Sequence, residues 1–105
     1  MAYYVLFDTE TTGNQEDDKV IQFGAMIVDQ KGKVEAFDEL CSTDVAIKLE
    51  AMEVHNITPD LLNGKPKAIE TNFYKKLEEL NSNENFLIAH NISFDMGMIK
   101  KEGFV

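Results

Sequence analysis

An apolar run that leads directly into two acids is the feature that most restricts how this chain can fold. Residues 2–7 read AYYVLF, and Asp8, Thr9 and Glu10 follow at once. A short continuous apolar run rich in β-forming residues is typical of a strand that is buried on both faces. We therefore expect an interior strand with Asp8 and Glu10 at its carboxyl end, where α/β sheets place their ligand sites.

Asp8 and Glu10 are predicted to share one side of this strand, because side chains alternate along it. Two carboxylates that close repel each other unless a cation lies between them. Hard oxygen ligands favour magnesium or manganese, so the pair predicts a divalent-cation site. The alternative, that the acids only cap the following loop, stays open. A second acid-x-acid pair, Glu16 and Asp18, lies in a polar stretch and is expected on the loop surface.

The rest of the chain shows strand signals and then mixed helix and strand signals. Strands are expected at residues 20–28, where apolar side chains alternate, and at 34–40, with a turn at Gly32 between them, so that the first three strands form an antiparallel meander. Helices are expected at residues 48–55 and 67–80, the second with an apolar stripe of Ile69, Phe73, Leu77 and Leu80. A short strand at residues 86–89 leads into a helical stretch that contains Asp95. A strand–helix–strand order calls for a right-handed crossover, so this last strand should lie parallel to the first. Asp95 would then arrive near Asp8 and Glu10 as a third ligand.

The charge balance limits how the chain can bind a polyanion. Its 105 residues, enough for one domain, carry a net charge of −9, and every basic residue other than the two histidines is a lysine. No basic stripe marks a nucleic-acid track, so metal ions would have to compensate much of a polyanion's charge. The single cysteine, Cys41, fits a reducing, cytoplasmic location.

Three segments of the sequence carry a family resemblance. They read FDTETTG at residues 7–13, EAMEVHNIT at 50–58 and HNISFD at 90–95. Together they resemble the motifs of the DEDD 3′–5′ exonuclease superfamily, in particular the proofreading epsilon subunits of bacterial DNA polymerase III and ribonuclease T. The resemblance covers the whole chain and implies an α/β fold similar to ribonuclease H, a mixed sheet with flanking helices.

The resemblance also implies roles for individual residues. Asp8 and Glu10 would bind two divalent cations, Mg²⁺ or Mn²⁺, and Asp95 would hold the second of them through water. The terminal nucleotide would contact Asp8 and Glu10 and also Thr11, Thr12, Glu50, His55 and Phe94. The implied reaction is hydrolysis of the last phosphodiester at a single-stranded or frayed 3′ end, releasing a 5′-nucleotide during DNA proofreading and replication, with a DNA polymerase subunit as the implied partner.

Two of these residues have simpler interpretations that remain open. Without the resemblance, His55 would be read as a surface or packing histidine. Phe94 lies four residues before Met98, a helical spacing that also suits a core position.

The chain departs from the superfamily at its carboxyl end. The superfamily needs a fourth acid and a histidine or tyrosine general base on a further helix, and nothing follows Val105 to supply them. We therefore expect residues 1–105 to be the N-terminal portion of a single exonuclease domain, truncated before the last strand and helix. Such a chain should be weakly active or inactive, and its bare sheet surface should favour self-association.

Three other functions stay open at this stage. The stretch DTETT also resembles the start of haloacid-dehalogenase-like phosphatases, with Asp8 as the nucleophile, although Glu10 replaces their second aspartate. A non-catalytic binding or scaffold module would keep the fold without the chemistry. An RNA-directed exoribonuclease would use the same motifs, because they serve DNA and RNA alike.

Overall fold

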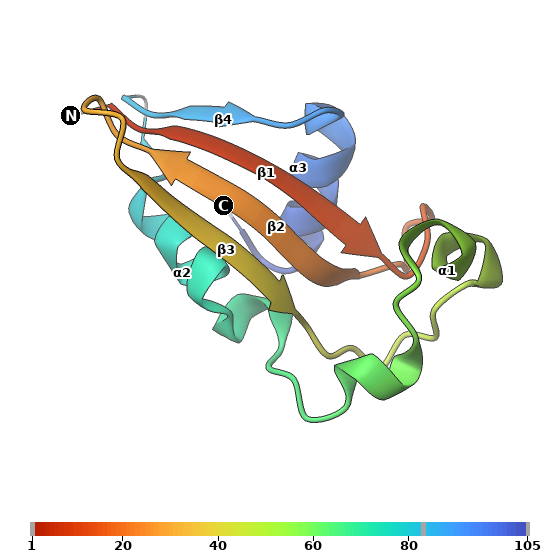
Figure 1. The fold of residues 1–105 in the computed structure, drawn as a ribbon. Coiled ribbons are helices and arrows are strands. Elements are labelled where there is room, and N and C mark those ends of the chain that lie inside the picture. Colours follow the sequence, from red (N-terminus) through yellow and green to blue (C-terminus); the bar gives the residue numbers. More distant parts are fainter. Residues whose placement is uncertain (1, 83, 105) are drawn as a thin grey trace.

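Four strands form one mixed sheet in the order β3-β2-β1-β4 (Figure 1). The computed structural model describes residues 2–82 and 84–104. The elements are β1 (Tyr4–Thr11), β2 (Val20–Val28), β3 (Val34–Leu40), α1 (Leu49–His55), the 3₁₀ helices η1 (Pro59–Leu62) and η2 (Ala68–Glu70), α2 (Asn72–Glu79), β4 (Phe86–Ile88) and α3 (Ile92–Lys101). None of the helices within these described ranges is long and apolar enough to cross a membrane.

The strand pairing confirms the predicted topology. β1 is antiparallel to β2, and β2 is antiparallel to β3 across a turn in which Gly32 adopts a φ of 83°. β4 pairs in parallel with the first half of β1, with Leu6 opposite Ile88. This parallel pairing brings α3, which follows β4, beneath the sheet.

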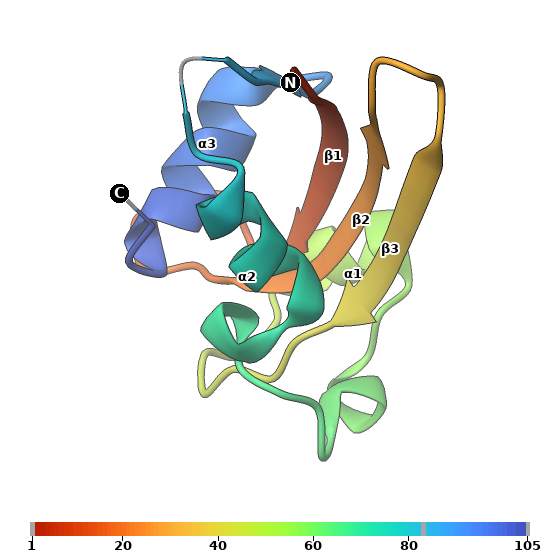
Figure 2. The ribbon, with the colours of Figure 1, turned by 90° about the vertical axis from the view of Figure 1, so that its left-hand side faces the viewer.

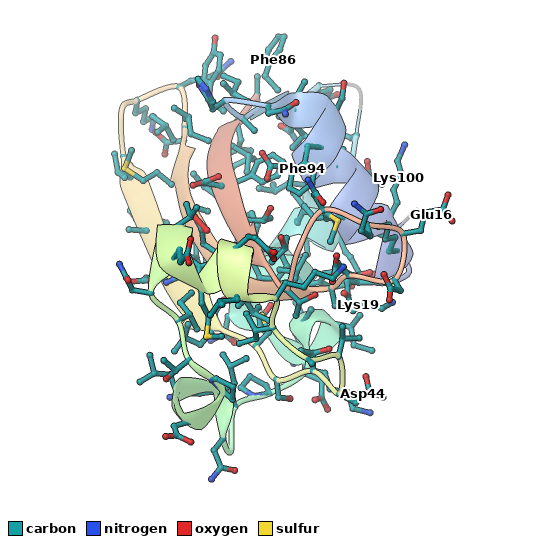
Figure 3. The ribbon with its side chains drawn as sticks, turned by 90° about the vertical axis from the view of Figure 1, so that its right-hand side faces the viewer. Glu16, Lys19, Asp44, Phe86, Phe94 and Lys100 are labelled. Atoms are coloured by element: carbon teal, nitrogen blue, oxygen red, sulfur yellow. The ribbon has the colours of Figure 1, made fainter. Side chains whose placement is uncertain are left out.

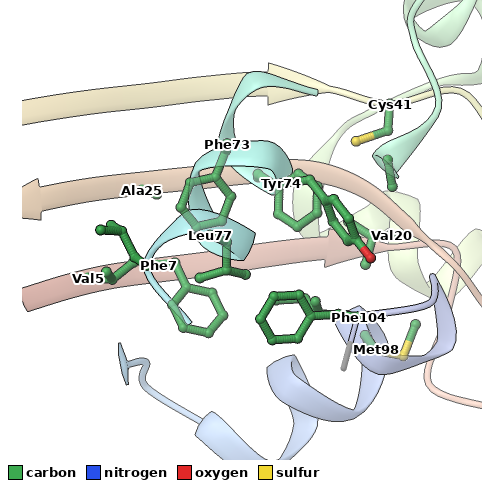
Figure 4. Packing of buried hydrophobic residues seen from close by; sticks show 14 of the residues in the cluster. Val5, Phe7, Val20, Ala25, Cys41, Phe73, Tyr74, Leu77, Met98 and Phe104 are labelled. Atoms are coloured by element: carbon green, nitrogen blue, oxygen red, sulfur yellow. The ribbon is translucent and has the colours of Figure 1, made fainter. Parts of the chain in front are cut away.

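Helices α2 and α3 cover one face of the sheet (Figure 2). Phe73 of α2 is the centre of the core beneath that face, because its ring meets the rings of Phe7, Phe23 and Phe37 at centroid distances of 6.1, 5.2 and 5.6 Å. Leu77, Met98 and Phe104 extend the same cluster, as Figure 4 shows. Cys41 lies fully buried, and burial raises the pKa of its thiol to about 12, so it is not a reactive nucleophile.

The other face of the sheet is open, which corrects the prediction that β1 is buried on both sides. Val5 and Phe7 point into the core, but Tyr4 is 44% and Leu6 37% exposed. Met26, opposite Leu6 on β2, is exposed as well. The physical reason is that the described helices all lie elsewhere, so the pleat sends alternate side chains of β1 toward solvent.

The predicted helix at residues 67–80 is interrupted at Thr71, which corrects a second expectation. Thr71 is extended, with ψ of 155°, and its hydroxyl accepts a hydrogen bond from the Tyr74 amide as the N-cap of α2. The Glu39 carboxylate accepts from the next two amides, at 3.0 and 2.7 Å. These caps start a new helix at residue 72, and they leave Ile69, which was expected in the apolar stripe, exposed.

Candidate active site

Asp8 and Glu10 lie on the open face of the sheet, near the end of β1. Their shared side confirms the expectation from strand alternation, since Val5, Phe7 and Thr9 face the helices instead. Asp8 is opposite Gly24 of β2, where an added Cβ would meet nothing within 4 Å. The Asp8 carboxylate therefore has free space beside it.

Asp95 reaches the same strand from the opposite face, in the first turn of α3. It is buried, and its Oδ1 accepts hydrogen bonds from the Thr9 hydroxyl at 2.5 Å and from the Thr9 amide at 3.3 Å. Thr9 lies between Asp8 and Glu10 in the sequence, so the crossover has placed Asp95 against the strand segment that carries the two acids. The predicted approach of Asp95 to this strand is confirmed, while its role as a third ligand stays a prediction.

The negative charge of Asp8 acts on both Glu10 and Asp95. Burial raises the pKa of Glu10, and the negative charge of Asp8 raises it further. Burial also raises the pKa of Asp95; hydrogen bonds from Thr9 oppose this effect, and the charge of Asp8 adds to it. Carboxyl groups whose pKa values are raised by burial and by the charge of a neighbouring acid mark a place that favours a cation.

Carboxylate oxygens are ligands that suit a hard divalent cation, but the acidic side chains that the structure describes here do not form a closed set of ligands. Within residues 2–82 and 84–104, no three acidic, histidine or cysteine side chains are grouped closely enough to form a metal site together. Asp8 and Glu10 supply adjacent carboxylates on one face, while Asp95 is held on the other face by Thr9. A metal site here would therefore rest on Asp8 and Glu10, with Asp95 in an outer position.

A cleft of about 570 Å³ adjoins Glu10. Its floor is the end of β1, one wall is α1, and Phe94 of α3 stands on another side; Figure 3 looks onto this end of the molecule. Of the residues predicted to touch a nucleotide, five line it: Glu10, Thr11, Glu50, His55 and Phe94. Its size is that of a small-molecule site.

Three predicted site residues lie outside this lining. Asp8 is exposed beside the cleft, and Asp95 is buried beneath it. Thr12 is fully buried, and its hydroxyl donates to Asp18 at 2.7 Å, so its side chain does not face the cleft. Phe94 is half-buried and packs against the main core as well, which reconciles its two interpretations.

His55 uses both ring nitrogens within the chain. The Ile57 amide donates to Nδ1 at 3.0 Å, so Nδ1 is an acceptor and the ring proton resides on Nε2. Nε2 then donates to the Thr11 carbonyl oxygen at 3.0 Å. His55 therefore braces α1 against β1 while its ring forms part of the cleft wall.

Asp18 lies next to the candidate site, and the sequence did not reveal that its side chain is buried. The expectation for the Glu16–Asp18 pair is confirmed for Glu16, which points outward (Figure 3), and is wrong for Asp18, whose side chain has no exposed surface. Its Oδ2 lies 2.6 Å from the Lys48 ammonium. Nothing in the run EDDK distinguishes the buried acid from its exposed neighbours, because the loop has no periodicity.

A mixed sheet backed by helices, with acids at the end of an interior strand and a cleft beside them, defines an α/β protein with a candidate active site at the carboxyl end of that strand. The family model described as exonuclease matches residues 5–105. The chain belongs to this exonuclease family, and its predicted membership is confirmed.

Relatives of known sequence are subunits or domains of larger proteins. The chain is 34% identical over 102 residues to DNA polymerase III subunit epsilon of Treponema pallidum, covering 94% of this chain and 45% of that protein. It is 37% identical over 99 residues to DNA polymerase III PolC-type of Clostridium perfringens, covering 93% of this chain and 7% of that one. The chain thus spans less than half the length of these curated relatives.

Solved structures confirm the predicted fold class. Escherichia coli Exonuclease I in complex with a dT13 oligonucleotide superimposes with a TM-score of 0.75 at 21% identity, covering 94% of this chain and 23% of that chain. Exonuclease X in complex with 5′ overhanging duplex DNA gives 0.68 at 26% identity, covering 90% and 52%. The described sheet and helices are therefore those of an exonuclease fold.

Proposed function

We propose that this chain forms the metal-binding and nucleotide-binding part of a 3′–5′ exonuclease that releases 5′-nucleotides. The observation that carries the proposal is the position of Asp8 and Glu10, on one face at the end of β1, directly beside a cleft walled by His55 and Phe94. Divalent cations at such carboxylates activate water and stabilise the charge on a phosphate and its leaving oxygen.

Each residue of the chain has a defined task in this proposal. Asp8 and Glu10 would hold Mg²⁺ or Mn²⁺, and Asp95, oriented by Thr9, would act on the second ion through water. Phe94 offers an aromatic surface on which a terminal base of any kind can stack. Thr11 and Glu50 lie at the cleft where they would contact the sugar and phosphate of the same nucleotide.

Turnover by residues 1–105 alone is expected to be slow. A general base must reach the attacking water, and both ring nitrogens of His55 are already engaged by backbone groups. Loss of such a base typically costs about 10²–10⁴-fold in rate. We therefore expect this chain to bind metal and nucleotide but to hydrolyse poorly.

DNA is the proposed substrate. The support is that the relatives include DNA polymerase III subunits and that two neighbours of similar fold were solved with DNA or an oligodeoxynucleotide. Proofreading within a polymerase III assembly is proposed on the same ground. Digestion of 5′-labelled dT and U oligonucleotides by the full-length gene product distinguishes DNA from RNA, and equal rates on both would contradict the choice of DNA.

Calorimetry with Mn²⁺ tests the proposed site directly. The parent chain should bind Mn²⁺, and Asp8→Ala should abolish the binding. Asp17→Ala, on the exposed loop, is the matched control and should bind like the parent. Mn²⁺ binding that persists in Asp8→Ala contradicts the proposed site.

A non-catalytic scaffold is the second candidate function. The observation that favours it is the absence of a closed cluster of three metal ligands among the described residues. If the parent chain takes up no Mn²⁺ and no mononucleotide, the scaffold function is favoured over the exonuclease.

A further inference from the structure

A polar cluster adjoins the cleft and consists of the buried Thr12 and Asp18 and the partly exposed Lys48, which also lines the cleft; we call it the loop clip. The Asp18 carboxylate accepts three hydrogen bonds, from the Thr12 hydroxyl at 2.7 Å, the Gln15 amide at 2.9 Å and the Lys48 ammonium at 2.6 Å. The Asp18 side chain is fully buried, whereas the side chain of its neighbour Asp17 is 82% exposed. Such a carboxylate remains buried only because every partner is in place.

The same cluster leaves no room for a side chain at Gly13. A Cβ atom added at Gly13 would lie 2.4 Å from Asp18 Oδ2 and 2.7 Å from Lys48 Cδ, far closer than real Cβ contacts. The carboxylate and the lysine stem therefore occupy the space that any other residue at position 13 would need. Asp18, an acid outside the first motif, thus accounts for Thr12 and Gly13 at the end of that motif.

Helix α1 forms a wall of the cleft. Hydrogen bonds to the backbone of residues 11 and 12 hold it at both ends. None of its own residues is buried, so apolar packing does not fix it. At its start the Lys48 amide donates to the Thr12 carbonyl oxygen at 2.8 Å. At its end His55 donates to the Thr11 carbonyl oxygen at 3.0 Å. Polar anchors to two successive residues of the chain therefore set the distance between α1 and β1.

We propose that the loop clip is a positioning device that fixes α1 against the end of β1 and so sets the width of the cleft. Asp18 does not touch the substrate; it acts through Lys48 and Thr12, which carry the anchor at the start of α1. The nature of the ligand rests on the proposed exonuclease function, but the effect on α1 does not.

A direct role of Lys48 in phosphate binding makes a different prediction. Lys48 lines the cleft, and its ammonium is held by Asp18. If Lys48 served only to bind phosphate, Asp18→Asn would free its charge, and nucleotide binding would stay equal or tighten. If the loop clip positions α1, Asp18→Asn and Lys48→Met should both weaken binding.

Amide hydrogen exchange in the full-length gene product tests the effect on α1 without any ligand. In Asp18→Asn, the amides of Lys48 and Ile57 should exchange at least tenfold faster than in the parent. The amide of Phe23 in β2 should keep its chemical shift, and its exchange should speed up only as far as the loss of unfolding free energy of the same variant requires, which shows that the fold is intact. Asp17→Asn is the matched control: it removes only an exposed carboxylate that lies 3.9 Å from the Lys48 ammonium, and it should leave all of these rates unchanged. Parent rates at Lys48 and Ile57 in Asp18→Asn overturn the proposal.

Binding of thymidine 5′-monophosphate in the presence of Mn²⁺ tests the link to the cleft. Asp18→Asn should raise its dissociation constant about tenfold, with Mn²⁺ affinity unchanged, and Lys48→Arg should retain more of the parent affinity than Lys48→Met. Faster exchange with an unchanged nucleotide affinity overturns the role in the cleft. A parent that binds neither Mn²⁺ nor nucleotide refutes the proposed function instead, and the exchange rates still decide whether the loop clip holds α1.

Discussion

The hydroxyl of Thr9 donates a hydrogen bond to Asp95, which lies 86 residues further along the chain. Replacing Thr9 by valine keeps the β-branched shape but removes the donor to this buried carboxylate. We expect the free energy of unfolding to fall by about 1.5–3 kcal/mol, the usual effect of a hydrogen bond to a charged group. Urea unfolding measures this change. Thr9→Ser should restore most of the loss, and parent stability in Thr9→Val would show that the contact is unimportant.

Glu10 should destabilise the metal-free chain at neutral pH. Its folded-state pKa is raised, first by burial and then by Asp8, so the folded state holds the proton more tightly than the unfolded state. The stability of the fold therefore falls as pH rises from the ordinary pKa of Glu10 through its raised folded-state pKa. Glu10→Gln should raise the melting temperature at pH 7 without metal, and the difference should shrink below about pH 4. With Mn²⁺ the order should reverse; a lower melting temperature for Glu10→Gln without metal contradicts this account.

The stability that Asp18 provides should depend on pH in the opposite sense. Burial raises the pKa of its carboxyl, but hydrogen bonds from Lys48, Gln15 and Thr12 outweigh burial and lower it overall. The stabilisation by Asp18 is therefore complete above the ordinary pKa of its carboxyl, about 3.8, and is lost as pH falls through its lower folded-state pKa. The Lys48 pKa is raised, chiefly by its hydrogen bond to Asp18, so its share is lost only above about pH 10.5.

Urea midpoints of parent and Asp18→Asn across pH check this dependence. The difference should be about 1.5–3 kcal/mol and flat between pH 5 and about pH 9, and it should vanish in strong acid. Asp17→Asn removes only an exposed ion pair with Lys48 and should stay within about 1 kcal/mol of the parent at every pH. A difference that grows as pH falls from 5 to 2 is the result that would count against the assignment.

Phe73 is expected to be the most sensitive aromatic position of the core. It is fully buried and meets three other phenylalanine rings. Phe73→Ala should cost about 3–5 kcal/mol in chemical denaturation. Phe86→Ala is the control, because Phe86 is more than half exposed and stacks on Tyr4 at the open face. Equal losses in both variants would mean that the core does not centre on Phe73.

The open sheet face should promote self-association of residues 1–105. Apolar side chains of three strands lie exposed together there: Tyr4, Leu6, Met26, Phe86 and Ile88. Leu6→Lys should reduce the mean mass in light scattering at high concentration. Ile69→Lys removes an equally exposed apolar residue outside this face and should change nothing. A parent that is monomeric at every concentration contradicts the expectation.

The elements with strong local signals could be predicted from the sequence. The AYYVLF run, the alternation in residues 20–28 and the turn at Gly32 predicted three strands and their antiparallel order, and the structure confirms them. The same signals placed Asp8 and Glu10 on one side of β1, and the crossover rule brought Asp95 to that strand. These features depend on strand alternation and chain topology, which local sequence encodes.

The burial of the loops and the environment of each acid depend on contacts between residues that are far apart in the sequence. Asp18 and Asp17 are adjacent and chemically identical, yet Asp18 is enclosed because Lys48, thirty positions away, reaches it, while Asp17 remains in solvent. The break at Thr71 depends on Glu39 of another element, and the exposure of Leu6 depends on which faces the helices cover. Contacts between distant residues carry no local pattern, so the pKa values and the cleft geometry they produce became visible only in the folded chain.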